Sequence, residues 1–256
     1  MNKAYLHEIF SSIQGEGPLV GVRQIFARLC GCNLTCEYCD TPTSRGQLAE
    51  ARIEQTAGTR DFVQVANPIE AAVFIKAIAK LNNPPHHSLA LTGGEPLLQA
   101  DFLLAVLPKL RELLPIYLET NGTLPNELNK VLPYLDFISM DIKLASATGC
   151  APDFAAHRAF LIIADQRRIE LNNMLAAFVK IVVTGETTDA ELQAAFSVIT
   201  EVDRSIEVIL QPASPVPGMA IKPPMPTQVL HWQTLGLAQL AQVRVIPQTH
   251  KLMGQL

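Results

Sequence analysis

Seven short apolar segments that hardly alternate with polar residues constrain the fold of this chain most strongly. They cover residues 22–29, 88–91, 116–119, 137–140, 178–183, 206–210 and 243–246. Unbroken runs of β-branched and other apolar residues are typical of strands that are buried on both faces, whereas half-exposed strands alternate. The segments therefore predict the strands of a buried, mostly parallel sheet.

Helical patterns lie between most of these segments. We expect helices over residues 98–113, 159–175, 189–201 and 227–242, and a further helix that begins at residues 67–70 and extends to Leu81. In that helix Asn67 would be the N-cap and Pro68 the first helical residue. Strands that alternate with helices predict an α/β fold with right-handed crossovers. No repeat or composition break marks a second domain, so we expect residues 1–256 to form one domain.

Two segments have the composition of loops. Residues 44–66 are polar and weakly periodic, and we interpret them as an insertion that covers a site or extends a dimer surface. Residues 212–226 contain six of the 18 prolines, which disfavours regular structure.

Charge and hydropathy exclude several classes of protein. The 20 lysines and arginines against 24 acids give a net charge of −4, which offers no global basic field for nucleic acid. The apolar run at residues 102–107 is far shorter than the roughly 18 residues that a membrane span needs. Glu8 stands where the apolar core of a signal peptide would continue. We expect a cytoplasmic protein with neither a nucleic-acid nor a membrane partner.

Four of the five cysteines fall within ten residues, at Cys30, Cys32, Cys36 and Cys39, while Cys150 stands alone. An odd number of cysteines in a cytoplasmic chain argues against a disulfide framework and favours a metal or redox site. The last three clustered cysteines have the spacing C-x3-C-x2-C, which allows one loop to wrap three thiolates around one metal centre. A structural zinc site that uses all four, or plain burial of the thiols, are the alternatives.

Polar residues follow the other predicted strands. They include Thr92-Gly-Gly-Glu-Pro96, Glu119-Thr-Asn-Gly-Thr123, Asp141 with Lys143, and Gln211. Ligands of parallel α/β sheets bind at the carboxyl ends of the strands, so these residues are candidates for one site. An ordinary turn at Gly93-Gly94 and a solvated Asp141–Lys143 pair are the simpler explanations. Gln14-Gly-Glu-Gly17 precedes the first predicted strand and lacks the dinucleotide spacing; we expect it to fold over the site.

The cysteine spacing, with Tyr38 directly before the last cysteine, resembles that of the radical S-adenosylmethionine (SAM) enzymes. Thr92-Gly-Gly-Glu-Pro96 resembles the motif of the same superfamily that binds the SAM amino group. The resemblance implies a partial (βα)6 barrel and a 4Fe–4S cluster held by Cys32, Cys36 and Cys39, with one iron left open for SAM.

Further motifs resemble one family within that superfamily, the 7-carboxy-7-deazaguanine synthases. They are Gln14-Gly-Glu-Gly17, Cys39-Asp-Thr41, and Ile246-Pro-Gln-Thr-His-Lys251 near the end of the chain. The resemblance implies a carbon–nitrogen lyase of queuosine biosynthesis that converts 6-carboxy-5,6,7,8-tetrahydropterin to 7-carboxy-7-deazaguanine. It also implies a Mg²⁺ ion at Thr41, a one-electron reductase such as flavodoxin, and a homodimer.

The resemblance assigns individual residues. Around the pterin substrate it places Ile13, Gln14, Gly15, Glu16, Arg28 and Thr92. Around SAM it places Tyr38, Cys39, Asp40, Gly94, Ser139, Asp141 and Gln211. It gives Cys30 and Cys150 no role, and leaves open whether His250 and Lys251 touch the substrate or anchor the tail. Another radical SAM enzyme, such as a glycyl-radical activating enzyme, and a non-catalytic zinc module are the alternative functions.

Overall fold

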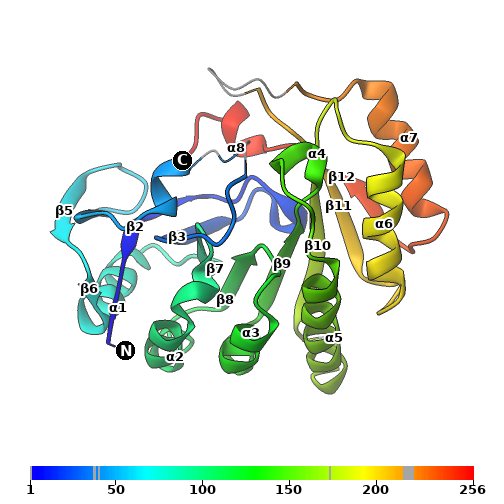
Figure 1. Cartoon of the computed structure of the whole chain (residues 1–256). Helices are drawn as coiled ribbons and strands as arrows, with labels where there is room; N and C mark the ends of the chain where they lie inside the picture. The colour runs from blue at the N-terminus through cyan, green and yellow to red at the C-terminus, as the bar shows by residue number, and fades with distance from the viewer. Residues whose placement is uncertain (1, 37–38, 40, 173, 216–221) are drawn as a thin grey trace.

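The computed structural model describes residues 2–36, 39, 41–172, 174–215 and 222–256, and its centre is a ten-stranded sheet (Figure 1). The strand order is β12-β11-β10-β9-β8-β7-β3-β2-β4-β5. These strands are β2 (Leu6–Ile13), β3 (Arg23–Leu29), β4 (Glu50–Glu54), β5 (Phe62–Ala66), β7 (Ser88–Gly93), β8 (Ile116–Thr120), β9 (Phe137–Ile142), β10 (Ala176–Val183), β11 (Glu207–Pro212) and β12 (Val243–Val245). A separate two-stranded sheet pairs β1 (Lys3–Ala4) with β6 (Ile69–Glu70).

The seven strands from β3 to β12 run parallel, and they are the seven that the sequence predicts. The sheet continues past β3 through the antiparallel β2, then β4, which is parallel to β2, and finally the antiparallel edge strand β5. The loop interpretation of residues 44–66 is therefore wrong, because β4 and β5 form a hairpin there. For residues 212–226 the prediction is confirmed in the described part, where nothing regular lies between the end of β11 and the start of α7.

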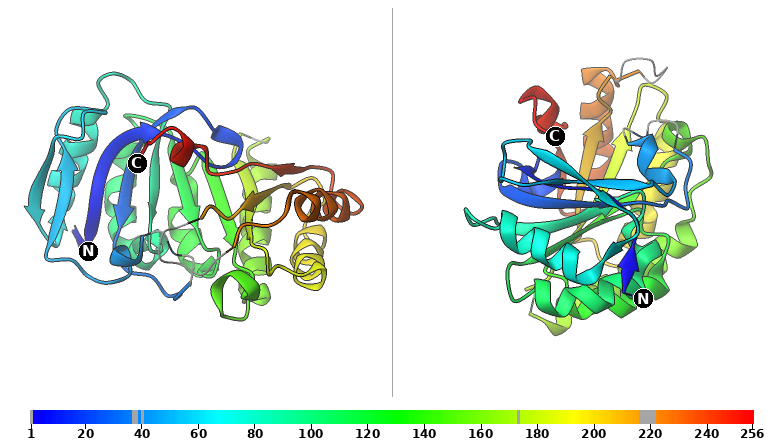
Figure 2. Two further views of the ribbon diagram at one scale, coloured as in Figure 1. Left: turned by 90° about the horizontal axis from the view of Figure 1, so that it is seen from above. Right: turned by 90° about the vertical axis from the view of Figure 1, so that its left-hand side faces the viewer.

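The α-helices are α1 (Ala71–Leu81), α2 (Ala100–Leu110), α3 (Pro125–Val131), α4 (Ala145–Thr148), α5 (Phe154–Glu170), α6 (Asp189–Thr200), α7 (Pro226–Leu237) and α8 (Thr249–Leu252). Short 3-10 turns cover Gly17–Leu19, Pro42–Arg45, Pro96–Gln99 and Leu132–Tyr134. Helices α1, α2, α3 and α5 lie along one face of the sheet, and α8 lies beyond the opposite face (Figures 1 and 2). No described helix has the length and apolar character needed to cross a bilayer.

The predicted start of the first helix is wrong. Helix α1 begins at Ala71, with Glu70 as its N-cap. The Asn67 side chain instead donates to the Leu6 carbonyl oxygen and accepts from the Leu6 N–H, which fixes the chain beside β2. Helix α5 begins and ends five residues before its predicted bounds, and α7 ends five residues early.

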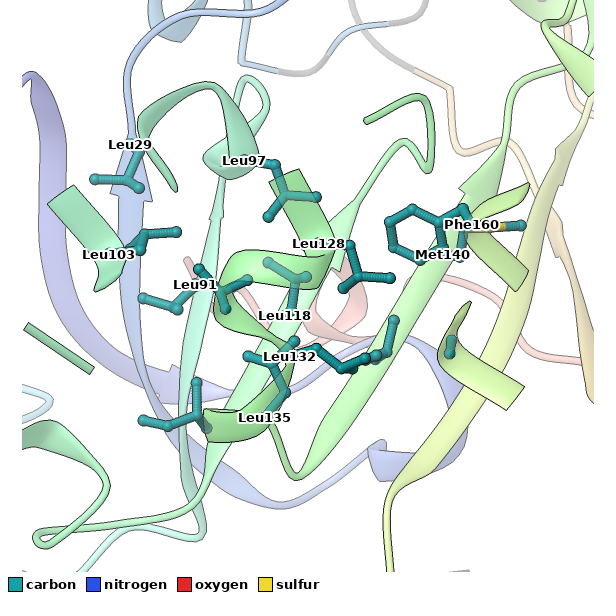
Figure 3. Packing of buried hydrophobic residues seen from close by; sticks show 14 of the residues in the cluster. Leu29, Leu91, Leu97, Leu103, Leu118, Leu128, Leu132, Leu135, Met140 and Phe160 are labelled. Carbon is teal, nitrogen blue, oxygen red and sulfur yellow. The ribbon is translucent and has the colours of Figure 1, made fainter. Parts of the chain in front are cut away.

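The two faces of each parallel strand have different roles, because successive side chains point to opposite sides. Leu29, Leu91, Leu118 and Met140 are fully buried and pack with leucines of the helical layer (Figure 3). The residues next to them in sequence, Arg28, Thr92, Glu119 and Asp141, all line a cavity on the other face. The apolar helix-facing side thus builds the core, and the opposite side carries the polar groups.

Candidate active site

A cavity of about 190 Å³ lies at the carboxyl ends of the parallel strands, on the face that the helices leave uncovered. Its lining comes from the end of β2 and the following turn, from five parallel strands, and from the C-terminal tail. The lining residues are Ile13, Gln14, Gly15, Glu16, Phe26, Arg28, Thr41, Thr92, Gly93, Gly94, Glu119, Thr120, Asn121, Ser139, Asp141, Lys143, Lys180, His250 and Leu256. The position agrees with the rule for ligand sites in parallel sheets.

Most of the residues singled out in the sequence meet at this cavity. All six expected around the pterin line it, as do Thr41, Gly94, Ser139 and Asp141. Gln211 is buried on β11 and is not part of the lining. Tyr38 and Asp40 lie outside the described residues.

A second cavity of about 110 Å³ adjoins the first and contains the three cysteines of the C-x3-C-x2-C motif. It shares Thr41, Gly93, Gly94, Asn121 and Lys143 with the larger cavity. Within the described ranges, no three His, Cys, Asp or Glu side chains stand close enough to hold one metal ion together. In a 4Fe–4S cluster each thiolate binds a different iron, so three thiols spread around one cavity suit a cluster.

The remaining cysteines do not line the second cavity. Cys30 is buried at the end of β3, where its carbonyl oxygen accepts from the Gln99 side chain. Cys150 is exposed, and its sulfur lies 3.9 Å from the hydroxyl of Thr35. Burial raises the pKa of the Cys32 and Cys36 thiols, so a positive centre is needed to bind them as thiolates.

The Gly93-Gly94-Glu95 turn is bonded directly to the cysteine loop. The N–H of Gly94 donates to the Leu29 carbonyl oxygen at 3.1 Å, and the N–H of Glu95 donates to the Gly31 carbonyl oxygen at 2.7 Å. A Cβ at Gly94 would run into the Gly31 carbonyl group, and Gly93 has a φ of +131° besides lying against the Leu29 backbone. Glycine is required at both positions by this close approach of two backbones. The turn thereby fixes the start of the cysteine loop.

Glu95 is fully buried beneath this turn. One carboxylate oxygen accepts from the Leu97 N–H at 3.0 Å and from the Thr120 hydroxyl at 2.9 Å, and the other accepts from the Asn121 N–H at 2.8 Å. Burial raises the pKa of Glu95 to about 7, although these bonds oppose the shift. Glu95 thus ties β7 to β8 below the cavity.

A chain of alternating charges crosses the cavity floor. The Lys180 Nζ lies 2.5 Å from Glu16 Oε2 and 3.5 Å from Asp141 Oδ2, and the Lys143 Nζ lies 2.6 Å from the same Asp141 oxygen. Burial alone would raise the pKa of Glu16, but the Lys180 ammonium, together with Gln248 and His250, lowers that pKa to about 2. For Lys180 burial favours the neutral form, yet the neighbouring Glu16 and Asp141 carboxylates raise its pKa above the ordinary value. Both partners are therefore ionised at neutral pH.

Both polar atoms of the Gln14 side-chain amide form hydrogen bonds within the protein. Its Nε2 donates to Gln24 Oε1 and Glu119 Oε1, both at 2.9 Å, and its Oε1 accepts from the Glu16 N–H at 3.0 Å. These bonds hold the turn after β2 against the sheet. The Gln14 amide thus orients the Glu119 carboxylate and holds the backbone of Glu16.

Arg28 reaches the cavity from β3 and is paired on its inner side. Its Nε donates to Glu8 Oε1 at 2.9 Å, while Arg52 on β4 binds the other Glu8 oxygen. Burial would raise the pKa of Glu8, but the two guanidinium groups hold it below the ordinary value. Two positive charges thus share one buried carboxylate.

Two buried acceptors have no hydrogen-bond partner among the described residues: Asp141 Oδ1 at the cavity, and Gln211 Oε1 on β11, outside the lining. Buried acceptors in folded proteins are nearly always satisfied, so an unpaired one indicates a missing donor. Both residues belong to the set that the family resemblance places around SAM.

The C-terminal tail closes one side of the cavity. The Thr249 N–H donates to the Gly15 carbonyl oxygen at 2.9 Å, and the Gln248 amide donates to Glu16 Oε1 at 2.8 Å. His250 and Leu256 both line the cavity. The structure therefore places His250 at the site, a position the sequence left open.

Some lining residues had no individual role assigned from the sequence. Glu119, Asn121 and Lys143 belong to the polar strand ends that were candidates for one site, and their position in the lining agrees with that expectation. Lys180 was missed entirely, and its signal is one lysine inside the apolar run Phe-Val-Lys-Ile-Val-Val. Phe26 was missed because one aromatic residue in a buried strand does not differ from core.

Comparison with known proteins places these features in a family. Residues 28–196 match the radical SAM superfamily model. The chain is 48% identical to the 7-carboxy-7-deazaguanine synthase of Geobacter sulfurreducens, over 99% of this chain and 98% of that protein. It is 34% identical to the enzyme of the same name from Methanothermobacter thermautotrophicus, over 98% of both chains. Its fold is similar to the crystal structure of QueE from Escherichia coli, with a TM-score of 0.59 at 17% identity, covering 96% of this chain and 94% of that chain.

Proposed function

The chain belongs to the radical SAM superfamily and, within it, to the 7-carboxy-7-deazaguanine synthase family, and from this membership we propose its reaction. The enzyme converts 6-carboxy-5,6,7,8-tetrahydropterin to 7-carboxy-7-deazaguanine, with contraction of the pyrazine ring and release of one ammonia. It is a carbon–nitrogen lyase, and the net reaction neither oxidises nor reduces the substrate. The observation that carries the proposal is that the family motifs, scattered over the chain, meet at one polar cavity beside the three cysteines.

Cys32, Cys36 and Cys39 would hold a 4Fe–4S cluster, which together with SAM would supply a carbon-centred radical that abstracts hydrogen. The two cavities share Gly93, Gly94 and Thr41, so these residues would lie beside SAM between the cluster and the larger cavity. The glycines allow its close approach to the backbone. The residues present thus fit the cluster and the SAM molecule that family membership implies.

For SAM we propose Gly94, Ser139, Asp141 and Gln211, with Tyr38, Cys39 and Asp40 on the cluster loop. The unpaired buried oxygens of Asp141 and Gln211 are suited to accept from the hydroxyl and amino groups of SAM. Ser139 is buried beside the cavity and presents a hydroxyl that both donates and accepts.

For the substrate we propose the turn residues Ile13 to Glu16 together with Arg28 and Thr92. The outer guanidinium edge of Arg28 binds the substrate carboxylate, since its inner nitrogen is occupied by Glu8. Glu16, ionised and fixed from both sides, accepts from the N–H groups of the pterin ring. Thr41 lines both cavities, and its hydroxyl would contribute an oxygen ligand to a Mg²⁺ ion beside the substrate.

We propose that a one-electron reductase such as flavodoxin serves the enzyme and that it is a homodimer. The structure contains one chain, and both proposals rest on family membership.

The decisive experiment incubates the cluster-reconstituted, reduced protein with SAM, Mg²⁺ and the carboxytetrahydropterin under anaerobic conditions. We expect 7-carboxy-7-deazaguanine and ammonia in equal amounts, and neither with a Cys32→Ala protein. Cluster-loaded protein that binds SAM but leaves the pterin unchanged would contradict the proposed reaction. Stoichiometric zinc in place of iron after reconstitution would contradict the radical chemistry itself.

A further inference from the structure

Lys180 is one of the polar residues at the cavity to which the reaction proposed above gives no role. It lies in the middle of β10, between Val179 and Ile181, and its side chain is only 13% exposed. Its strand neighbours in register are Asp141 on β9 and Ile209 on β11. Burying an ammonium group is costly and contributes little to stability compared with an apolar side chain of the same size. Folding alone therefore does not explain a lysine at this position.

The contacts of Lys180 point to one acidic residue. Its Nζ lies 2.5 Å from Glu16 Oε2, whereas the distance to Asp141 Oδ2 is 3.5 Å. Asp141 has a closer cation in Lys143, at 2.6 Å. Lys180 is thus the short contact of Glu16 and only a secondary contact of Asp141.

Glu16 is held from two directions. Lys180 binds Oε2 from the sheet, and Gln248 binds Oε1 from the C-terminal tail. Glu16 lies on the turn between β2 and β3, and its backbone N–H donates to the Gln14 side chain. A carboxylate on a turn needs such anchors, because a displacement of about 1 Å at a positioned group is enough to reduce catalysis strongly.

We propose that Lys180 is a positioning residue, which anchors Glu16 to β10 and keeps it an ionised acceptor for the N–H groups of the substrate ring. The inference rests on the proposed function for the identity of the substrate. It assigns Lys180 no contact with the reacting atoms.

The electrostatics at Glu16 support this role. Burial favours the protonated form of Glu16 and the Lys180 ammonium opposes it, so loss of Lys180 should raise the pKa of Glu16 and favour uptake of a proton. A protonated carboxyl donates where the site needs an acceptor. The charged or titratable side chains that line the cavity around Glu16 are Lys180, Asp141, Lys143, Glu119, Arg28 and His250.

The test compares cluster-loaded Lys180→Met with wild type across pH values from about 6 to about 8.5. We expect the KM for the carboxytetrahydropterin to rise roughly tenfold or more, with a smaller change in kcat, since a lost partner of a buried charge weakens binding. The KM of the variant should rise further as the pH falls, while the wild type shows no such dependence from Glu16. The Kd for SAM should change less, because Lys143 still pairs with Asp141. Lys109→Met, which removes an exposed lysine of α2, is the matched control.

A double-mutant cycle with Glu16→Gln separates positioning from general damage to the fold. If Lys180 acts through Glu16, adding Lys180→Met to Glu16→Gln should change KM less than about twofold. Additive effects of the two substitutions, or a Lys180→Met enzyme with the KM and pH profile of the wild type, would overturn the proposal.

A third measurement needs no substrate. In wild type the pKa of Glu16 lies below its unfolded value, so its contribution to stability is present at neutral pH and is lost as the pH falls towards 2. In Lys180→Met we expect the pKa of Glu16 to be higher than in wild type, so less stability should be lost as the pH falls towards 2, and Glu16→Gln should remove this difference between the two proteins. Equal acid profiles of wild type and Lys180→Met would overturn the proposal. If wild type fails to convert the pterin, the proposed function falls, and the comparison of the acid profiles still decides the role of Lys180.

Discussion

Glu8 on β2 accepts a hydrogen bond from Arg28 Nε at 2.9 Å, and this pair joins the core of the sheet to the cavity wall. The other Glu8 oxygen accepts from Arg52 Nε at 2.7 Å, so the three residues carry one net positive charge. Arg28 lines the cavity, and the excess charge therefore faces the place proposed for the substrate carboxylate. One buried acid thus both stabilises the sheet and orients the arginine.

Glu8→Gln should weaken folding and substrate binding together. The loss leaves two guanidinium groups without their shared carboxylate, which is expected to reduce the free energy of unfolding by about 3 kcal/mol. The KM for the pterin should rise several-fold as Arg28 loses its fixed orientation. Urea unfolding and steady-state kinetics measure the two effects, with the exposed Glu112→Gln as control. A normal KM in a destabilised variant would restrict Glu8 to a structural role.

Gly94→Ala should disturb the link between the Gly-Gly turn and the cysteine loop. The added Cβ would meet the Gly31 carbonyl group, whereas a Cβ at Gly46 would meet no atom within 4 Å. We expect Gly94→Ala to lower stability by about 2 kcal/mol and to reduce SAM affinity at least tenfold, since the backbone has to move. Gly46→Ala should leave both the stability and the SAM affinity within experimental error of wild type. Thermal unfolding and equilibrium SAM binding measure the two quantities, and equal behaviour of the two alanine variants would refute the steric argument.

The parallel strands could be predicted from the sequence because burial on both faces leaves continuous apolar runs. Strand β2 could not be predicted in this way, because Glu8, Ser11 and Ser12 interrupt its apolar residues. All three of these polar residues are nevertheless buried. Their partners come from distant segments: Glu8 pairs with Arg28 and Arg52, and the Ser11 hydroxyl bonds to His86 at 2.8 Å. A local pattern does not contain such partners.

The hairpin of β4 and β5 was missed for a different reason. Strand β5 is at the edge of the sheet, and none of its five residues is buried, so its sequence resembles a polar loop. The wrong N-cap at Asn67 reflects competition for its side chain, which bonds to β2 instead of to the helix. Propensity gives way to tertiary contacts in both places.

The location of the site could be predicted because polar residues at strand ends converge in any parallel sheet. The hydrogen-bond and ion-pair partners inside the site could not be predicted. The Glu16–Lys180 contact joins residues 164 positions apart, and a lysine inside a strand gives no indication of its partner. The tail contacts of Gln248 and His250 likewise depend on how the chain returns after β12.

The cysteines should separate into two classes when each is replaced. Replacing Cys32, Cys36 or Cys39 by serine should abolish the cluster, because each thiolate binds its own iron. Cys30→Ala and Cys150→Ser should retain about four irons per chain, since neither sulfur lines the cluster cavity. Iron content and visible absorption after anaerobic reconstitution give the answer. Loss of iron in Cys150→Ser would assign that exposed thiol a role in cluster binding.

Glu95 should give the free energy of unfolding an unusual dependence on pH. Its pKa in the folded protein is about 7, above the ordinary value of 4.5, so the folded state holds a proton that the unfolded state releases first. The contribution of this group is therefore fully present below about pH 4.5 and is lost as the pH rises through 7. By linkage the loss amounts to about 3 kcal/mol for an isolated group.

Replacing Glu95 by glutamine should remove that dependence. The variant loses one acceptor, opposite either the Leu97 N–H or the Asn121 N–H, and should be less stable than wild type at low pH. Its free energy of unfolding should nevertheless fall less between about pH 5 and about pH 8, because it has no proton to release there. Urea unfolding of SAM-free protein at several pH values measures the slope, and the exposed Glu70→Gln should keep the slope of wild type. Parallel pH profiles for wild type and Glu95→Gln would mean that Glu95 is already ionised in the folded protein and that its three hydrogen bonds outweigh its burial.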